Sequence, residues 1–237
     1  YSAYMSIGTV ASSVFLPRVS ELYLEDDGME AISGLFAKVG RITFLILGFV
    51  LGGFITIGSE FITLWAGEGY FESYLVAVIV MVPFTIDLVQ GLGLTILQVA
   101  NKYYFRGVMY LVIALANIVL TIVFLNLLGI PGAALSTGLS MLIGNGFIMN
   151  WFYWKRIGLD IPFFWKEVCE LVVPMVMATV LASLIYELFS GYHGSWFSVA
   201  AFGLIYAFLY AILQWKYGLN DYEKKAFSKV FHRRRAI

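Results

Sequence analysis

Residues 74–106 read YLVAVIVMVPFTIDLVQGLGLTILQVANKYYFR, an apolar run followed at once by two cations. The run, 74–99, exceeds the roughly 20 residues that a helix needs to cross the hydrocarbon core of a bilayer. The cations, Lys102 and Arg106, stand in the gap before the next apolar run. This order of apolar run and cationic gap predicts a helix that crosses a membrane and ends at its surface.

Further apolar runs of about this length occupy most of the chain. The composition is 61% hydrophobic and 13% charged, against roughly 25% charged in an average globular domain. We therefore predict an all-α fold, a polytopic transmembrane helix bundle with about seven crossings. The predicted spans are 1–16, 42–58, 74–99, 107–128, 132–154, 168–189 and 196–215, followed by a basic tail at 216–237.

All 15 Lys and Arg residues fall in every second gap between these runs or in the tail. The positive-inside rule makes the gaps that contain them cytoplasmic. The gaps at 59–73, 129–131 and 190–195 contain no Lys or Arg and are predicted to face outward. The sequence thus predicts a multi-pass protein of the cell (cytoplasmic) membrane with a cytoplasmic C-terminus.

The net charge is zero, so the asymmetry of charge across the membrane is the informative quantity, and we expect no nucleic acid among the partners. Membrane lipids are expected partners. The cations of the tail have two interpretations, an anchor that fixes topology and a site for anionic lipid head groups.

Asp87 lies near the middle of the span 74–99, one turn after Pro83, which tends to kink a helix. At 100° per residue, Gln90 and Gln98 share a face with Asp87. A carboxylate at the bilayer centre costs about 2.5–3.5 kcal/mol on insertion scales, so it must be paired, protonated or hydrated. Two interpretations follow: a proton or cation site in a transport pathway, and a protonated Asp bonded to a neighbouring helix.

The next two spans carry polar and small side chains at helical spacing. Asn117 and Thr121 share a face and are further candidates for a substrate or ion pathway. Small residues recur every four positions in the span 132–154, which predicts close helix packing rather than ligand contact. These small residues are Gly132, Ser136, Ser140 and Gly144.

The sequence lacks the residues that several kinds of catalytic or metal site require. The two histidines, His193 and His232, are far apart and predicted on opposite sides, so neither a His metal site nor a His base is expected within the membrane. No glycine-rich loop has the Walker spacing of an ATP-driven pump. We expect no enzyme activity, no catalytic residues, no metal and no cofactor. An H⁺ or Na⁺ gradient, or the membrane potential, would drive any transport.

Four short patterns follow one another along the chain: LPRVSEL at 16–22, LWAGEGYFES at 64–73, ILQVANKYYFRG at 96–107 and GIPGAALST at 129–137. In order, spacing and surrounding hydropathy they resemble the polysaccharide-biosynthesis (O-antigen-type) flippases of the multidrug/oligosaccharidyl-lipid/polysaccharide (MATE-like) exporter superfamily. The resemblance implies two helical lobes around a central cavity. The chain begins without an initiator Met, and we interpret it as the second lobe plus two C-terminal helices, with the N-terminal lobe of the same protein missing.

The resemblance also implies a function. The expected substrate is a lipid-linked oligosaccharide on a polyprenyl or dolichyl pyrophosphate, moved across the cytoplasmic membrane by alternating access for polysaccharide or glycan assembly. No predicted span contains Lys or Arg, so we expect the missing lobe, or Arg18, Lys38 and Arg41 at the cytoplasmic mouth, to contact the pyrophosphate. The alternatives are a drug/cation antiporter of the same superfamily, a membrane-embedded glycosyl or acyl transferase, and a non-transporting scaffold.

Overall fold

A computed structural model describes residues 4–6, 15–25, 27–189, 191 and 194–225. Within these ranges six helices are long and apolar enough to cross a membrane, so the chain is an all-α, multi-pass membrane protein, as the sequence predicts. The predicted span 1–16 lies almost wholly outside the described residues. The helices α3 (Gly28–Ala66), α6 (Tyr103–Leu128) and α9 (Ile161–Leu188) each span by themselves. The other three spanning units, Glu68–Val89, Ile130–Ile157 and Trp196–Gly218, contain α4 (Phe71–Val89), α7 (Ile130–Met141) and α10 (Trp196–Leu213) with the short segments next to them.

Shorter helical segments extend or connect these spans. The π-helical segment η2 (Leu142–Ile148), α8 (Met149–Phe152) and the π-helical η3 (Tyr153–Ile157) continue α7, and the π-helical η5 (Gln214–Gly218) continues α10. The others are α2 (Leu16–Leu22), the 3₁₀-helix η1 (Glu68–Tyr70) and α5 (Leu92–Val99).

Tight turns make neighbouring spans antiparallel. Gly129 alone separates α6 from α7, and its φ of 67° lies in the left-handed region that glycine adopts without strain. Gly67, with φ of 104°, ends α3 in the same way. Both turns fall in gaps that contain no Lys or Arg, and the described cations lie near the opposite ends of the helices.

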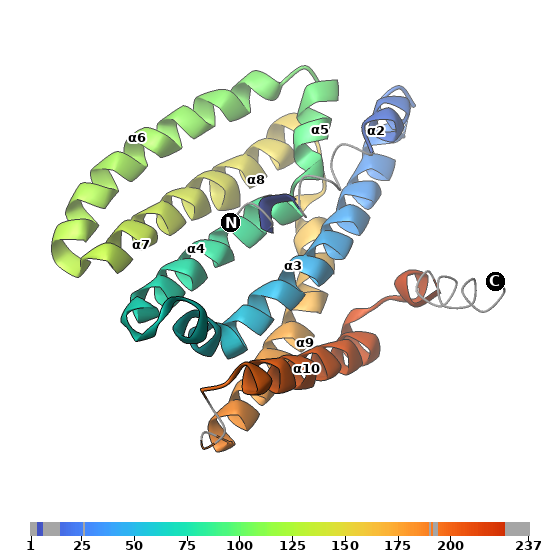
Figure 1. The fold of residues 1–237 in the computed structure, drawn as a ribbon. Coiled ribbons are helices and arrows are strands. Elements are labelled where there is room, and N and C mark those ends of the chain that lie inside the picture. The colour runs from blue at the N-terminus through green and yellow to red at the C-terminus, as the bar shows by residue number, and fades with distance from the viewer. Residues whose placement is uncertain (1–3, 7–14, 26, 190, 192–193, 226–237) are drawn as a thin grey trace.

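Helix α3 is shared by two groups of helices (Figure 1). On one side α4, α7 and α6 lie next to one another in that order, and on the other side α9 and α10 pack against α3 and each other. The α3–α9 contact is close, since the ring of Phe36 stacks on that of Phe164 with centroids 4.3 Å apart. By contrast, Met109 is the one buried residue of α6, so most of the apolar surface of α6 is open to lipid or to a protein neighbour.

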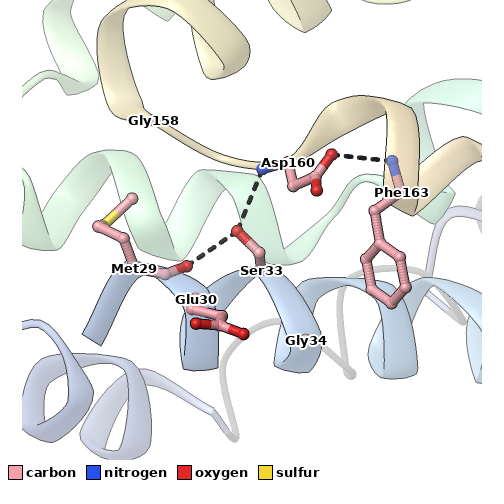
Figure 2. A pocket seen from close by; sticks show the side chains of 7 residues that line it. All are labelled: Met29, Glu30, Ser33, Gly34, Gly158, Asp160 and Phe163. Atoms are coloured by element: carbon pink, nitrogen blue, oxygen red, sulfur yellow. Dashed lines mark hydrogen bonds between the residues drawn. The ribbon is translucent and has the colours of Figure 1, made fainter. Parts of the chain in front are cut away.

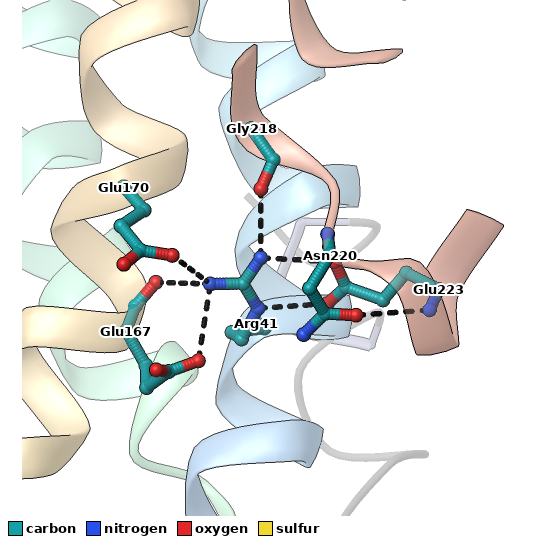
Figure 3. Close-up of polar contacts among 6 residues, drawn as sticks. All are labelled: Arg41, Glu167, Glu170, Gly218, Asn220 and Glu223. Carbon is teal, nitrogen blue, oxygen red and sulfur yellow. Dashed lines mark hydrogen bonds and ion pairs between the residues drawn. The ribbon is translucent and has the colours of Figure 1, made fainter. Parts of the chain in front are cut away.

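Arg41, within α3, is the most tightly held charge of the bundle (Figure 3). Its side chain is 1% exposed, and its Nε and Nη2 donate to the two carboxylate oxygens of Glu223 at 2.8 and 2.9 Å. Nη1 donates to the Glu167 carbonyl at 2.6 Å and pairs with the carboxylates of Glu167 and Glu170 at 3.3 and 3.1 Å. Nη2 also donates to the Gly218 carbonyl at 2.7 Å. Arg41 thus joins α3, α9 and the segment after α10.

The partner of Arg41 is fixed by its own local structure. The Glu223 carboxylate accepts from the Asn220 backbone N–H at 3.0 Å, and the Asn220 side chain accepts from the Glu223 N–H at 2.9 Å. This reciprocal pair is a capping box, which sets the start of a helical turn at 221–225. Local hydrogen bonds therefore orient the Glu223 carboxylate toward Arg41. Because its donors are used within the protein, Arg41 is not free to bind a substrate in this conformation.

Glu60 holds the opposite end of the same helix. It falls in the gap predicted to face outward, yet it is buried within α3. Its Oε1 accepts from the Gly194 N–H at 2.6 Å and from the hydroxyl of Ser198. These donors lie at the start of α10, where unpaired N–H groups and the helix dipole favour a negative charge. Glu60 therefore ties the start of α10 to α3.

We predict that Arg41→Gln lowers the free energy of unfolding of the full-length protein in detergent by ~3–5 kcal/mol, because it leaves a buried carboxylate without its partner. Unfolding by sodium dodecyl sulfate, followed by circular dichroism, measures the change. Arg18→Gln is the control, since Arg18 forms an exposed pair with Glu21 at 3.0 Å and such pairs contribute ~0–1 kcal/mol. Equal effects of the two substitutions would contradict the role given to Arg41.

Candidate functional site

The predicted span 74–99 is not one continuous helix. α4 passes through Pro83 without interruption and ends at Val89, and α5 starts at Leu92. The break falls at Gln90 and Gly91, so the expected polar stripe is divided between two helices. Figure 1 shows α5 turning away from the direction of α4. Helices interrupted within a membrane protein expose backbone and side-chain groups that substrates and ions use in transporters.

Asp87 lies at this break and is paired. Its Oδ1 is 3.2 Å from Nη2 of Arg106, and both side chains are 12% exposed. The same Nη2 donates to the Tyr110 hydroxyl at 2.6 Å, one turn further along α6. The carboxylate that the sequence places in the middle of an apolar run is therefore paired, with a cation in the first turn of α6.

Arg106 belongs to a span, contrary to the expectation that no span contains a cation. The apolar run predicted a start at 107, whereas α6 begins at Tyr103. The first turn of α6, which contains Arg106, therefore extends into the predicted gap. Arg106 was not predicted as the partner of Asp87. The available signal was its position directly before the predicted span 107–128.

Tyr153 completes the surroundings of the pair. The Tyr153 side chain is 1% exposed and interacts electrostatically with Arg106. It packs against Gly93 of α5 so closely that a Cβ there would lie 2.5 Å from the tyrosine oxygen. Any larger residue at position 93 would displace the ring. Glycine at the break thus lets a phenol from the α7–η3 unit reach the buried pair.

A π-helix and several unpaired polar atoms adjoin the break. η2 contacts both α4 and α6, and π-helical turns are rare and frequent at functional sites. Among the described residues, the buried atoms Gln90 Oε1, Arg106 Nε and Asn145 Nδ2 have no hydrogen-bond partner. Buried polar groups are normally satisfied. These three atoms therefore mark the part of the bundle where a ligand, an ion or water would gain most by binding.

The other predicted pathway residues of α6 lie elsewhere. Thr121 shares a 2.6 Å hydrogen bond with Ser136 of α7, and Asn117 donates to Thr137 at 3.4 Å. A Cβ at Gly144 of η2 would lie 2.0 Å from Ile113, so the small residues of the α7–η2 unit do pack closely on α6, as predicted. The structure does not bring Asn117 and Thr121 together with Asp87 and Gln90. It joins them in the α6–α7 interface.

The remaining candidates are dispersed. Gln98 is exposed on α5, whereas Gln90 is 3% exposed and donates to the Ile86 carbonyl at 3.0 Å. Of the three predicted mouth cations, Arg41 is buried, Arg18 is paired with Glu21, and Lys38 is exposed. Of the three, Lys38 is therefore exposed and forms no ion pair with a carboxylate of the described residues.

A pocket of about 460 Å³ lies between the start of α3 and the loop before α9 (Figure 2). Ser33 Oγ accepts from the Asp160 N–H at 3.1 Å and donates to the Met29 carbonyl at 2.8 Å, and the Asp160 side chain caps α9. The pocket wall contains the carboxylates of Glu30 and Asp160 and no described Lys or Arg. It is unsuited to an anion, so the Asp87–Arg106 cluster is the better candidate site.

Comparison with models of known protein families, with curated proteins and with solved structures finds no match to this chain in any of the three. The interpretation of the site therefore depends on its geometry and on the sequence patterns.

We predict that Arg106→Gln destabilises the full-length protein more than the double variant Asp87→Asn with Arg106→Gln. The single change leaves a buried carboxylate unpaired, at a cost of ~3–5 kcal/mol, and the second change removes that charge. A double-mutant cycle of unfolding free energies in detergent measures the coupling. Lys155→Gln, at an exposed lysine, is the control for loss of one cation. Additive effects at Asp87 and Arg106 would contradict the pairing.

Proposed function

We propose that the protein is a flippase that moves a lipid-linked oligosaccharide across the cytoplasmic membrane by alternating access, with the Asp87–Arg106 cluster on the substrate path. The observation that carries the proposal is a guanidinium, 12% exposed and paired with Asp87, whose buried Nε has no hydrogen-bond partner among the described residues. A phosphate or pyrophosphate is the chemical group that a guanidinium binds best, through paired N–H donors.

The ion pair supplies the chemistry that such transport needs. A lone arginine within the membrane would be costly, and Asp87 neutralises it while no substrate is bound. A pyrophosphate that reaches Arg106 would compete with the carboxylate for the same donors. Uptake of a proton by Asp87 would release the arginine to the substrate, which gives a direct coupling to an H⁺ gradient. Tyr110, exposed beside the pair, would keep one donor of Arg106 oriented.

The alternatives receive less support from the same geometry. A drug/cation antiporter needs an acidic side chain that attracts a cation, and the charge of Asp87 is already opposed by Arg106 at 3.2 Å. A glycosyl or acyl transferase needs an accessible acid/base pair or a metal site. The spanning helices are joined by short connections, in which we identify no such pair among the described residues.

We predict that Asp87→Asn lowers export of the lipid-linked saccharide by at least about tenfold, the effect of ~1.4 kcal/mol on a rate-limiting step. The amount of protein in the membrane should be unchanged. Leaflet translocation in liposomes that contain the full-length protein measures export, and immunoblotting measures the amount. Glu68→Gln, an exposed carboxylate at the far end of α3, is the matched control. Wild-type export by Asp87→Asn would remove the carboxylate from the mechanism.

The proposal includes an orientation, with the cationic ends of the helices in the cytoplasm. In a Cys169→Ser background, we predict that Glu68→Cys reacts with an impermeant maleimide in intact cells. Lys155→Cys should react only after the membrane is permeabilised. Both positions are exposed and lie at opposite ends of the bundle. Labelling of Lys155→Cys in intact cells would reverse the orientation.

A further inference from the structure

A second feature lies on the other side of α3, away from the Asp87–Arg106 cluster. An apolar groove of about 400 Å³ runs between α3 and the end of α10. Its walls are Leu45, Ile46, Phe49, Tyr210, Ala211, Gln214, Trp215 and Leu219. Ile46 and Trp215 are 48% and 51% exposed, so the groove is open to the surroundings of the bundle.

The polar residues of the wall do not present their polar groups to the groove. The Tyr210 hydroxyl donates to the Leu45 carbonyl at 2.8 Å, and Gln214 Nε2 donates to the Leu171 carbonyl at 2.9 Å. Both donors are therefore used within the protein. The surface that remains is hydrocarbon and aromatic, which suits an extended aliphatic chain.

Two lysines belong to the helices that form the groove, Lys38 on α3 and Lys216 on η5. Lys38 precedes the wall residues Leu45 and Ile46 by about two turns on the same side of α3, and its Nζ lies 5.2 Å from the ring centroid of Tyr222. Lys216 follows the wall residue Trp215, with its Nζ 5.0 Å from the ring centroid of Tyr217. In the described part of the chain neither lysine forms an ion pair with a carboxylate.

Three carboxylates of the same end of the bundle are already engaged. Glu167, Glu170 and Glu223 all pair with Arg41, so they do not neutralise the lysines. Both lysines are exposed, and both stay next to an aromatic ring. An unneutralised cation at an aromatic-rich end of an apolar groove matches a molecule with an anionic head and an aliphatic tail.

We infer that this groove binds an anionic membrane phospholipid, with one acyl chain between α3 and α10 and the phosphate near Lys38 and Lys216. Charge complementarity selects an anionic over a zwitterionic head group, because each lysine near a membrane surface favours it roughly fivefold. The transported lipid is not the occupant, because the groove lies between α3 and α10, whereas Arg106 belongs to α6 in the group of helices on the other side of α3 (Figure 1). This lipid would be a resident component of the α3–α10 unit.

The test uses the full-length protein in detergent and two lipids with identical chains, dioleoylphosphatidylglycerol and dioleoylphosphatidylcholine. Native mass spectrometry counts the lipid retained. The wild type should retain phosphatidylglycerol in preference, by roughly tenfold or more if both lysines contribute. Lys38→Gln with Lys216→Gln should abolish the preference. Ala211→Trp fills the groove and should lower retention of both lipids, and Ile46→Trp is a second groove-filling variant should the first not fold.

The matched control is Lys155→Gln with Lys166→Gln, which removes two exposed cations outside the groove. Lys155 also lies over an aromatic ring, with Nζ 3.7 Å from the Trp154 centroid. The control should keep the phosphatidylglycerol preference. The inference is overturned by equal retention of the two lipids in the wild type, by an equal loss in the control, or by undisturbed binding in folded groove-filling variants. Displacement of phosphatidylglycerol by an equimolar polyprenyl phosphate would also overturn it, by assigning the groove to the carrier lipid.

Discussion

A charge in the hydrocarbon core of a membrane needs a partner, and α3 meets this requirement at two positions that define the bundle. Arg41 and Glu60 are 19 residues apart on α3, which corresponds to about 28 Å and so to roughly the thickness of the hydrocarbon core. Arg41 binds α9 and the segment after α10, and Glu60 binds the start of α10. The two residues hold both ends of this helical unit on α3.

The other group of helices is held differently. α4, α7 and α6 pack through small residues, and the π-helix η2 and the break after Val89 interrupt the regular backbone. One ion pair lies there, and several buried polar atoms next to it have no partner among the described residues. Ion pairs and hydrogen bonds of Arg41 and Glu60 hold the α3–α9–α10 unit, although Glu60 Oε2 and Gln214 Oε1 in it have no partner among the described residues. The other four unpaired buried side-chain atoms of the described residues lie on the α4–α7–α6 side. Arg41 is fully engaged, whereas unpaired polar atoms lie next to Asp87. This difference is why we propose a transport function beside Asp87 rather than beside Arg41.

Hydropathy predicted the helices well because a spanning helix needs a long apolar run, and each of the six spans after 1–16 coincides with a described spanning helix over most of its length. The span 74–99 is the exception in continuity, since it is divided between α4 and α5. Helix ends were predicted less well. α3 extends back to Gly28, beyond the apolar run 42–58, and the helical spacing of Ile32 and Phe36, which are buried, indicates this start in the sequence. The Arg41–Glu223 pair joins residues 182 positions apart, and no local pattern encodes it. Asn220 and Glu223 have the three-residue spacing of a capping box, which is a local pattern, whereas their contact with Arg41 is not local.

The same reasoning explains why the sequence predicted Asp87 as a site residue but did not predict its ion-pair partner. An acid inside an apolar run is visible in one dimension, whereas its partner Arg106 comes from a different helix. α6 packs along α7 and has little direct contact with α4, so the Asp87–Arg106 pair is a principal link between α4 and the start of α6. Any movement of that end of α6 away from α4 has to break the pair, and a proton on Asp87 or an anion on Arg106 weakens it. In the proposed mechanism, the pair would therefore couple the position of a lightly packed helix to the binding of charge.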